Sequence, residues 1–277
     1  MISHYTQRFS GYMRTVVDHF RAMPAPSRVL DIPAGAGMVT DALRALGHEV
    51  VPADINGLRP DYVRADMTLD LPFDDQSFDA VVCTEGIEHM LNPDHLLKEL
   101  LRVCRVGGTV VISTPNVLCF YSRLQFLLTG TFHQFSPAQL REFRRDEPGD
   151  RFHIAPIDYN RLRYMAGFFG ASVERVAGDR YKRKVLMPIY GVLWCLGRPW
   201  ARSLFYGSRA RREHADRNRA IDRDMNSAPV LFGRSLILFL RKNEHVPDMP
   251  ETRAVTEAAE VASRVPRERG EQLLSRD

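Results

Sequence analysis

Two glycines and an aspartate form the pattern with the most chemical content in this chain. Asp31 ends a short apolar run, and Gly35 and Gly37 follow it in a turn rich in proline and glycine. From Met38 to Leu46 the apolar residues recur at helical spacing, which predicts a helix. Such a unit brings backbone N–H groups and a helix N-terminus against a ligand. It predicts a site for a nucleoside cofactor; the alternative is an ordinary tight turn between strand and helix.

The spacing within the turn distinguishes between families of nucleoside-binding proteins. A dinucleotide fingerprint requires G-x-G-x-x-G, and Thr40 occupies the position of its third glycine. Residues 31–37 instead resemble the D-x-G-x-G-x-G motif of class I S-adenosylmethionine-dependent methyltransferases. Pro33 replaces the first glycine, so a neighbouring amide must make any cofactor contact there. An NAD-dependent oxidoreductase would also need Tyr-x-x-x-Lys, which neither Tyr121 nor Tyr159 begins.

A second run, residues 71–89, resembles the methyltransferase pattern LPF-x-D-x-S-F-D-x-V and continues into the family's LEH. The resemblance covers residues 28–116 and resumes near His153. Independently, Asp54 ends a predicted strand about twenty residues after the glycines, where an acid can accept both ribose hydroxyls. The resemblance implies a set of cofactor contacts: Asp31 at the amino-acid end, Ala34, Gly35 and Gly37 in the turn, Asp54 and its neighbour Ile55 at the ribose, Asp66 and Met67 at the adenine, and Thr84 and Glu85 near the methionine.

Apolar runs alternate with helical patterns along the chain, and this order predicts the fold class. Strand, helix and strand repeat in the first half, which predicts a parallel sheet covered on both faces. The expected strands lie at residues 28–32, 48–54, 61–66, 78–83, 106–116, 171–176 and 230–240. We therefore expect a Rossmann-like α/β fold with a seven-stranded, mostly parallel sheet whose last strand is antiparallel, as the resemblance implies.

Two insertions depart from a minimal methyltransferase. The first, residues 117–150, is apolar and aromatic at its start and follows the fifth strand, so it would lie over the edge of the sheet where such folds bind ligands. We interpret it as a substrate lid. Similar inserts resemble those of methyltransferases of bacterial polysaccharide or lipid-linked glycan assembly. The second insertion, residues 180–228, lies between the sixth and seventh strands.

Three histidines are candidates for the base that would remove a proton from a hydroxyl acceptor. His89 directly follows the fourth strand, His153 resembles a substrate-facing family position, and His133 lies in the presumed lid. Each histidine has a structural alternative, and Glu85 could serve instead. Quinone-precursor O-methyltransferases use a divalent metal, but no His, Asp and Glu set here has diagnostic spacing, so we expect no metal site.

The second insertion contains an apolar segment with a basic surround. Residues 185–206 are rich in aromatic side chains but too short and too interrupted by proline and glycine to span a bilayer. Arginines and lysines flank the segment across residues 180–219, which is typical of contact with an anionic membrane surface. The alternative is a hairpin that packs on the protein's own core or on a dimer partner. Nucleic-acid binding is not expected, because acids dilute the basic stretch.

Composition sets the remaining expectations. We predict one methyltransferase domain over residues 1–243 and a charged, disordered tail over residues 244–277. The four cysteines are widely spaced, and the N-terminal residues lack the apolar core of a signal peptide. We therefore expect a cytoplasmic protein, which could also bind the inner face of the membrane. No motif indicates the oligomeric state.

The function predicted from the sequence is methyl transfer from S-adenosylmethionine. The resemblance favours O-methylation of a small or lipid-linked acceptor such as a glycan sugar. A quinone-precursor O-methyltransferase is the first alternative. A cofactor-binding or membrane-associated scaffold without catalysis is the second, because Pro33 departs from the motif.

Overall fold

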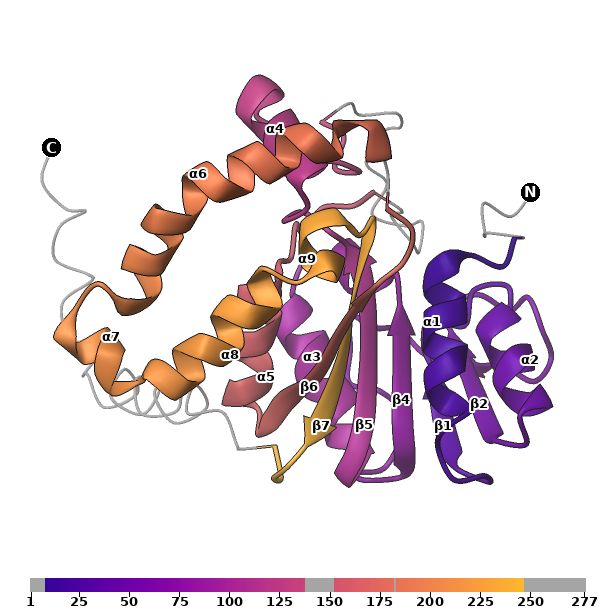
Figure 1. Ribbon diagram of the computed structural model, residues 1–277. Coiled ribbons are helices and arrows are strands. Elements are labelled where there is room, and N and C mark those ends of the chain that lie inside the picture. Colours follow the sequence, from indigo (N-terminus) through magenta and orange to yellow (C-terminus); the bar gives the residue numbers. More distant parts are fainter. Residues whose placement is uncertain (1–7, 138–151, 182, 247–277) are drawn as a thin grey trace, which may run out of the picture. The chain divides into compact units, whose positions relative to one another are not determined.

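A mixed sheet forms the centre of the fold (Figure 1). The structure is a computed structural model that describes residues 8–137, 152–181 and 183–246. The seven strands are β1 (Arg28–Asp31), β2 (Glu49–Asp54), β3 (Val63–Arg64), β4 (Phe78–Thr84), β5 (Cys104–Pro115), β6 (Ala171–Gly178) and β7 (Ser235–Lys242). They lie in the order β3-β2-β1-β4-β5-β7-β6.

Strand directions agree with the predicted fold class. Strands β1 to β5 pair in parallel, and β7 pairs antiparallel with both β5 and β6. The register of β1 places Asp31 beside Pro52 of β2 and Val82 of β4. The seven-stranded sheet with an antiparallel last strand is therefore confirmed. Its C-terminal edge brings together the ends of β1, β2 and β4, where ligands bind in open α/β sheets.

Helices cover both faces of the sheet, as expected for parallel strands (Figure 1). On one face lie α1 (Gly11–Phe20) and α2 (Met38–Ala45), and on the other α3 (Pro93–Val103) and α5 (Tyr159–Phe168). The apolar sides of α1 and α2 form one core cluster with residues of β1, β2, β4, β5 and β7. Four leucines of α3 are fully buried, namely Leu96, Leu97, Leu100 and Leu101. These contacts hold the strand ends, and hence the site, in place.

Local signals explain the start of two helices near the site. Asn92 caps α3 by accepting a hydrogen bond from the His95 N–H at 3.1 Å, and Pro93 occupies the first helical position. Asp158 caps α5 through bonds from Asn160 N at 2.7 Å and Arg161 N at 3.0 Å. These caps fix where the segments that follow β4 and precede β6 enter their helices.

The insertions are largely helical. The first contains α4 (Phe120–Thr129) directly after β5, while the prediction for residues 138–150 lies outside the described residues. The second contains a short 3₁₀ turn, η2 (Lys184–Leu186), then α6 (Met187–Tyr206), α7 (Arg209–Glu213), α8 (Ala215–Met225) and α9 (Ala228–Phe232). In the described part of the chain, no helix has the length and apolar character to cross a bilayer. The expected disorder of the tail falls outside the description from residue 247 onward.

One strand boundary was predicted wrongly. The seventh strand was expected from Val230, but Val230 lies in α9 and β7 begins at Ser235. Pro229 near the start of α9 favours the helix. Leu231 of α9 packs in a small cluster with Phe120 and Tyr190 rather than in the sheet. An apolar run of this length is compatible with either element, so its type was decided by tertiary packing.

Candidate active site

The glycine turn after β1 has the conformation that its sequence requires. Gly35 and Gly37 have φ values of 56° and 80°, in the left-handed region that favours glycine, and Gly37 immediately precedes α2. The Ala34 N–H donates to Ala53 O at 2.9 Å, which ties the turn to β2. A Cβ on Gly37 would lie 2.8 Å from the Tyr62 hydroxyl oxygen and would also clash with Arg59. The turn thus brings backbone to the C-terminal edge of the sheet, where Tyr62 and Arg59 cover Gly37.

Asp54 reaches from the end of β2 into this turn. Its carboxylate accepts hydrogen bonds from Gly35 N at 2.8 Å and Asn56 N at 3.0 Å, and the side chain is buried. The Tyr62 hydroxyl donates to Gly35 O at 3.2 Å on the other side of the turn. The predicted ribose acid therefore lies against the predicted cofactor-binding backbone, as the sequence interpretation requires.

Asp31, at the end of β1, is the most buried acid of the turn. The Thr40 hydroxyl donates to Asp31 Oδ2 at 2.6 Å, whereas Oδ1 is buried and accepts no hydrogen bond from the described residues. Burial raises the pKa of Asp31 to about 7, and the Thr40 hydrogen bond opposes that rise. A buried carboxylate oxygen without a donor is suited to a ligand that brings a positive charge or an N–H group.

Pro33 and Gly86 explain the departure from the family motif. A Cβ on Gly86 would lie 2.7 Å from Cδ of Pro33, so the proline ring occupies the space that a side chain at residue 86 would take. The turn after β1 and the turn after β4 therefore fit each other closely. Gly86, in the turn after β4, therefore leaves room for the ring of Pro33.

The end of β4 supplies Thr84 and Glu85. Thr84 is buried, and Glu85 has a φ of 50°, unusual for a residue with a side chain. Its N–H donates to Ser113 O at 2.9 Å, and its carboxyl accepts from the Ser113 hydroxyl at 3.2 Å. Burial raises the pKa of Glu85 to about 7, and the nearby Arg234 opposes that rise. Glu85 is thus held at the strand end by β5 and by its own backbone conformation.

The predicted adenine side of the site follows β3. Asp66 Oδ1 accepts hydrogen bonds from Thr68 N at 2.9 Å and from the Thr68 hydroxyl at 2.7 Å, which holds the loop in a tight turn. Met67 and Ile55 are half-buried, and Ala34 is buried. Because β3 pairs with β2 through Asp54 and Arg64, this loop begins beside the ribose acid. The contacts of these residues with a cofactor remain predictions.

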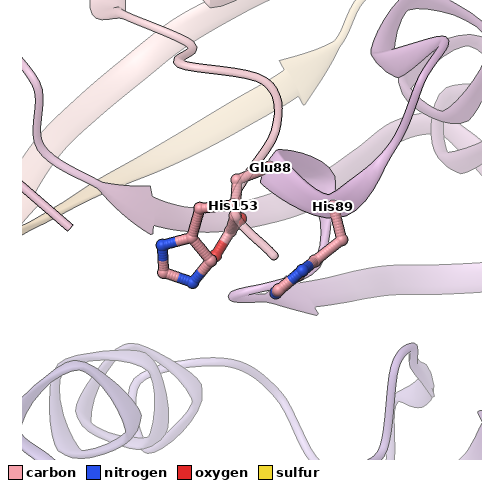
Figure 2. Close-up of side chains that lie close together, drawn as sticks. All are labelled: Glu88, His89 and His153. Carbon is pink, nitrogen blue, oxygen red and sulfur yellow. The ribbon is translucent and has the colours of Figure 1, made fainter. Parts of the chain in front are cut away.

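Two of the three candidate histidines meet. The rings of His89 and His153 have centroids 4.9 Å apart, and the side chain of Glu88 lies beside the His153 ring (Figure 2). Glu88 and His89 belong to η1 (Ile87–His89), the short 3₁₀ turn after β4. The N–H groups of Ile154 and Ala155 both donate to the backbone oxygen of Glu88 at 3.0 Å. These bonds attach the segment that carries His153 to the end of β4.

Hydrogen bonds fix the orientation of both rings. Nδ1 of His89 lies 3.0 Å from Phe152 O, and Nδ1 of His153 lies 2.9 Å from Gln134 O. A carbonyl can only accept, so Nδ1 carries the proton in both bonds, and in a neutral ring Nε2 carries the lone pair. Burial, with a smaller contribution from His89, lowers the pKa of His153 to about 4. His153 is therefore neutral, and able to accept a proton, at neutral pH.

Glu88 is a buried carboxyl that the sequence analysis did not select. It is fully buried. Among the described residues, no donor has the distance and angle of a hydrogen bond to either carboxyl oxygen. Oε1 lies 4.0 Å from Nε2 of His153. Burial, and then the charge of Glu85, raises the pKa of Glu88 well above its usual value. Raising the pKa favours the neutral carboxyl, and its distance to Nε2 of His153 makes Glu88 a candidate positioning residue.

Arg234 and Tyr12 complete the surroundings of the site and were also missed as functional residues. Arg234, just before β7, acts electrostatically on Glu85, Glu88 and His153. Burial raises the pKa of Tyr12 on α1 to about 12, with Glu85 as the next cause. The sequence places Tyr12 only on an apolar helix face, and it does not distinguish Arg234 from the other arginines. No local pattern marks either residue as part of the site.

His133 belongs to a neighbouring pocket. Its ring lies edge-on to the ring of Tyr121, with centroids 4.8 Å apart. The backbone N–H of His133 donates a hydrogen bond to the Ser122 hydroxyl at 3.0 Å. The pocket is lined by residues of α4, α6, α9 and the segments beside them: Cys119, Tyr121, His133, Tyr190, Leu231, Phe232, Gly233 and Arg234. The ring of His133 thus contacts Tyr121, whereas the rings of His89 and His153 contact each other.

Glu88, His89 and His153 could also hold a metal ion. Each offers one ligand atom, and these atoms lie within 4.8 Å of one another. Zinc bonds to nitrogen and carboxylate oxygen are about 2.0–2.2 Å long, so the side chains would need to close slightly around an ion. The Nδ1 bonds to backbone carbonyls are typical of histidines that ligate a metal through Nε2. No local sequence pattern marks this set, because His153 comes from a distant segment.

The fold and the site define a class of protein. A glycine turn after β1, an acid at the end of β2 and polar groups after β4 meet at the C-terminal edge of a sheet with the strand order of class I methyltransferases. The glycine backbone of the turn and the unmatched oxygen of Asp31 fit a nucleoside cofactor that carries an amino acid.

Comparisons with known proteins agree with this class. A family model described as "Methyltransferase domain" matches residues 30–112. A demethylmenaquinone methyltransferase of Clavibacter sepedonicus is 44% identical over 109 residues, which are 34% of this chain and 44% of that protein. A demethylmenaquinone methyltransferase of Beutenbergia cavernae is 38% identical over 189 residues, 60% of this chain and 75% of that protein.

Among solved structures, a SAM-dependent methyltransferase from Archaeoglobus fulgidus is similar with a TM-score of 0.51 and 17% identity, covering 83% of this chain and 91% of that one. This likeness supports the fold. The chain belongs to the S-adenosylmethionine-dependent methyltransferases, since the Beutenbergia protein is related over most of its length. The family implies S-adenosylmethionine as the cofactor. The match to the Clavibacter protein spans less than half of that protein, so acceptor specificity does not follow from it.

The raised pKa of Asp31 leads to a prediction for cofactor binding. If Asp31 holds the ammonium group of the cofactor, binding requires the carboxylate, whose pKa is about 7 in the free protein. Binding then lowers this pKa, so affinity is full above pH 7 and falls as the pH drops below it. The Kd for S-adenosylhomocysteine should rise about tenfold between pH 8 and pH 6.

Calorimetric titrations at several pH values would measure this change. Asp31→Asn should bind more weakly with a flat pH dependence, whereas Glu85→Gln should keep the slope although the pKa of Glu85 is also about 7. The same slope in wild type and Asp31→Asn would contradict the role of Asp31.

Proposed function

We propose that this protein transfers a methyl group from S-adenosylmethionine to a hydroxyl oxygen of a small or lipid-linked acceptor, such as a sugar of a glycan. The observation that supports this most is the neutral His153, held beside His89 and Glu88 at the end of β4. Gly86 links this group to the glycine turn through its contact with Pro33. A proton acceptor thus lies next to the predicted cofactor site, as O-methylation requires.

Different residues of the chain have different roles in such a reaction. The bound cofactor supplies a methyl group on a sulfonium sulfur, which leaves as a neutral thioether. Asp31, Asp54 and the glycine backbone bind and orient it, so that sulfur, methyl carbon and acceptor oxygen can lie in line. Nε2 of His153 takes the hydroxyl proton as the new C–O bond forms. The Nδ1 bond to Gln134 O keeps the ring in place, and the buried Glu88 carboxyl lies 4.0 Å from Nε2.

A quinone precursor is the second candidate acceptor. Related proteins of Xanthomonas axonopodis and Maricaulis maris, each 31% identical over 111 and 125 residues, are named ubiquinone biosynthesis O-methyltransferase, and this name favours an O-methylated quinone precursor. The cluster of Glu88, His89 and His153 gives a second reason, because a divalent ion there would bind an aromatic diol. This candidate predicts loss of activity with a chelator and recovery with added metal, whereas the histidine mechanism is insensitive to both.

A methyl-transfer assay with a panel of acceptors tests the proposal. The purified chain would be incubated with S-adenosylmethionine labelled in its methyl group and with lipid-linked sugars or prenylated catechols. The product should release its label as methyl iodide in hot hydriodic acid, which cleaves methyl ethers but not C-methyl groups. Label that is retained on carbon, or transferred only to amines, would contradict O-methylation.

A further inference from the structure

Helix α6 presents an apolar stripe that the described residues leave uncovered. Six large apolar side chains recur at helical spacing from η2 to the end of α6, and each is 54–84% exposed: Val185, Ile189, Val192, Leu196, Trp200 and Leu204. We call these residues the α6 stripe. Scattered apolar residues are normal on a surface, but a continuous stripe over a whole helix marks an interaction site.

The opposite side of α6 is the one that packs on the protein. Tyr190 stacks on Phe120 of α4, with ring centroids 5.3 Å apart and an interplanar angle of 9°. The Trp194 Nε1–H donates to the Asn226 side chain at 2.8 Å, and Arg198 pairs with Asp222 of α8 at 2.9 Å. These contacts fix the rotation of the helix, so the α6 stripe faces away from α8. One side of the segment therefore packs on the protein, as the hairpin alternative expects, and the other side is uncovered by the described residues.

A second apolar group lies on α4. Phe126, Leu127 and Leu128, at its C-terminal end, are 46–79% exposed. Figure 1 shows α4 and α6 together beyond the C-terminal ends of the parallel strands, on the side of the candidate active site. Both helices line the pocket that contains His133 and Arg234, through Tyr121 and Tyr190. The apolar surface is thus next to this pocket.

The charge of the chain is concentrated around the same helix. Residues 180–219 contain 11 basic and 2 acidic residues, a net charge of +9, whereas the whole chain has a net charge of +4. The rest of the chain is therefore net negative, at −5. Within the described residues, no ion pair involves Lys184, Arg202 or Arg217. An apolar stripe inside a strongly basic segment is complementary to anionic lipid, which offers apolar chains below negative headgroups.

We propose that α6 lies in the headgroup region of an anionic membrane, with the α6 stripe inserted toward the acyl chains and the surrounding arginines on the lipid phosphates. A second copy of this chain is the other apolar occupant, but two copies would bring two segments of +9 together. This inference goes beyond the proposed function, because membrane binding needs neither cofactor nor acceptor. It places the C-terminal edge of the sheet at the membrane surface.

The two tryptophans of the chain make the test direct, because both Trp194 and Trp200 lie on α6. Trp194→Phe leaves Trp200, which belongs to the stripe, as the only tryptophan. Vesicles of phosphatidylglycerol and phosphatidylcholine should shift its emission to the blue, and brominated acyl chains should quench it. Pure phosphatidylcholine vesicles should do neither.

Vesicle co-sedimentation with matched variants completes the test. Leu196→Ser with Trp200→Ser should weaken partitioning by about tenfold or more, since two apolar side chains leave the membrane. The control, Leu69→Ser with Tyr164→Ser, removes two exposed side chains outside α6 and should bind as wild type. Arg211→Gln with Arg212→Gln should reduce the preference for anionic vesicles, and binding should weaken as salt rises.

Three results would overturn the proposal. One is the absence of binding and of any spectral shift with anionic vesicles. Another is equal binding by the stripe variant and the control. The third is a blue shift of Trp200 emission that occurs without lipid, grows with protein concentration and appears together with a dimer in sedimentation velocity. That result would assign the α6 stripe to self-association.

Discussion

His153→Ala should lower kcat for methyl transfer by about 10²–10⁴-fold, the range expected when a positioned general base is lost. His153 is neutral because burial lowers its pKa to about 4, and its Nδ1 bond to Gln134 O directs Nε2 away from that carbonyl. Without the ring, the acceptor proton would have to pass to water. Affinity for S-adenosylhomocysteine should change little, because His153 is not among the predicted cofactor contacts.

Single-turnover kinetics would measure this effect separately from product release. The matched control is His133→Ala, because His133 lies in the neighbouring pocket beside Tyr121 and should cause a far smaller loss. Glu88→Gln tests the positioning role, because the variant keeps the shape of the side chain but replaces the carboxyl near Nε2 of His153 with an amide. Nearly unchanged kcat in His153→Ala would remove the histidine from the mechanism.

Asp54→Ala should weaken binding of S-adenosylhomocysteine by about 10- to 150-fold. Hydrogen bonds to a charged group contribute about 1.5–3 kcal/mol, and the alanine variant loses the predicted bonds to the ribose hydroxyls. The structure adds a second cause, since Asp54 also holds Gly35 N and Asn56 N in the turn. Both effects act in the same direction.

Calorimetry on folded variants would test this prediction. Asp61→Ala is the control, because Asp61 is a surface carboxylate paired with Arg44 at 2.6 Å and Arg59 at 3.1 Å. Thermal unfolding of each variant would show whether the fold is intact. If a folded Asp54→Ala protein binds as tightly as wild type, Asp54 does not hold the ribose.

Much of the fold was predictable because its signals are local. The glycine turn, the buried β4 and the capped α3 each carry their pattern within a few residues, and their order determines the sheet. The boundary of β7 was not predictable, because Val230 and Leu231 suit either element and packing against Phe120 and Tyr190 decided between them.

The candidate site was predictable only in part. The cofactor-side residues follow strand ends, so their positions could be read from the sequence, whereas His89 meets His153 through bonds from Ile154 and Ala155 to Glu88 O. Contacts between distant segments leave no local pattern. The same limit applies to α6: its spacing predicts an apolar face, but only the contacts of Trp194 and Arg198 show which side is uncovered.

The central claim is that the turn after β1 binds the nucleoside cofactor. A crystal structure of the chain with S-adenosylhomocysteine tests it most directly. We predict the ribose hydroxyls on Asp54, the adenine beside Asp66 and Met67, and the amino group near Asp31. A ligand bound elsewhere, or a turn that stays closed by Tyr62 and Arg59 at saturating ligand, would contradict the claim.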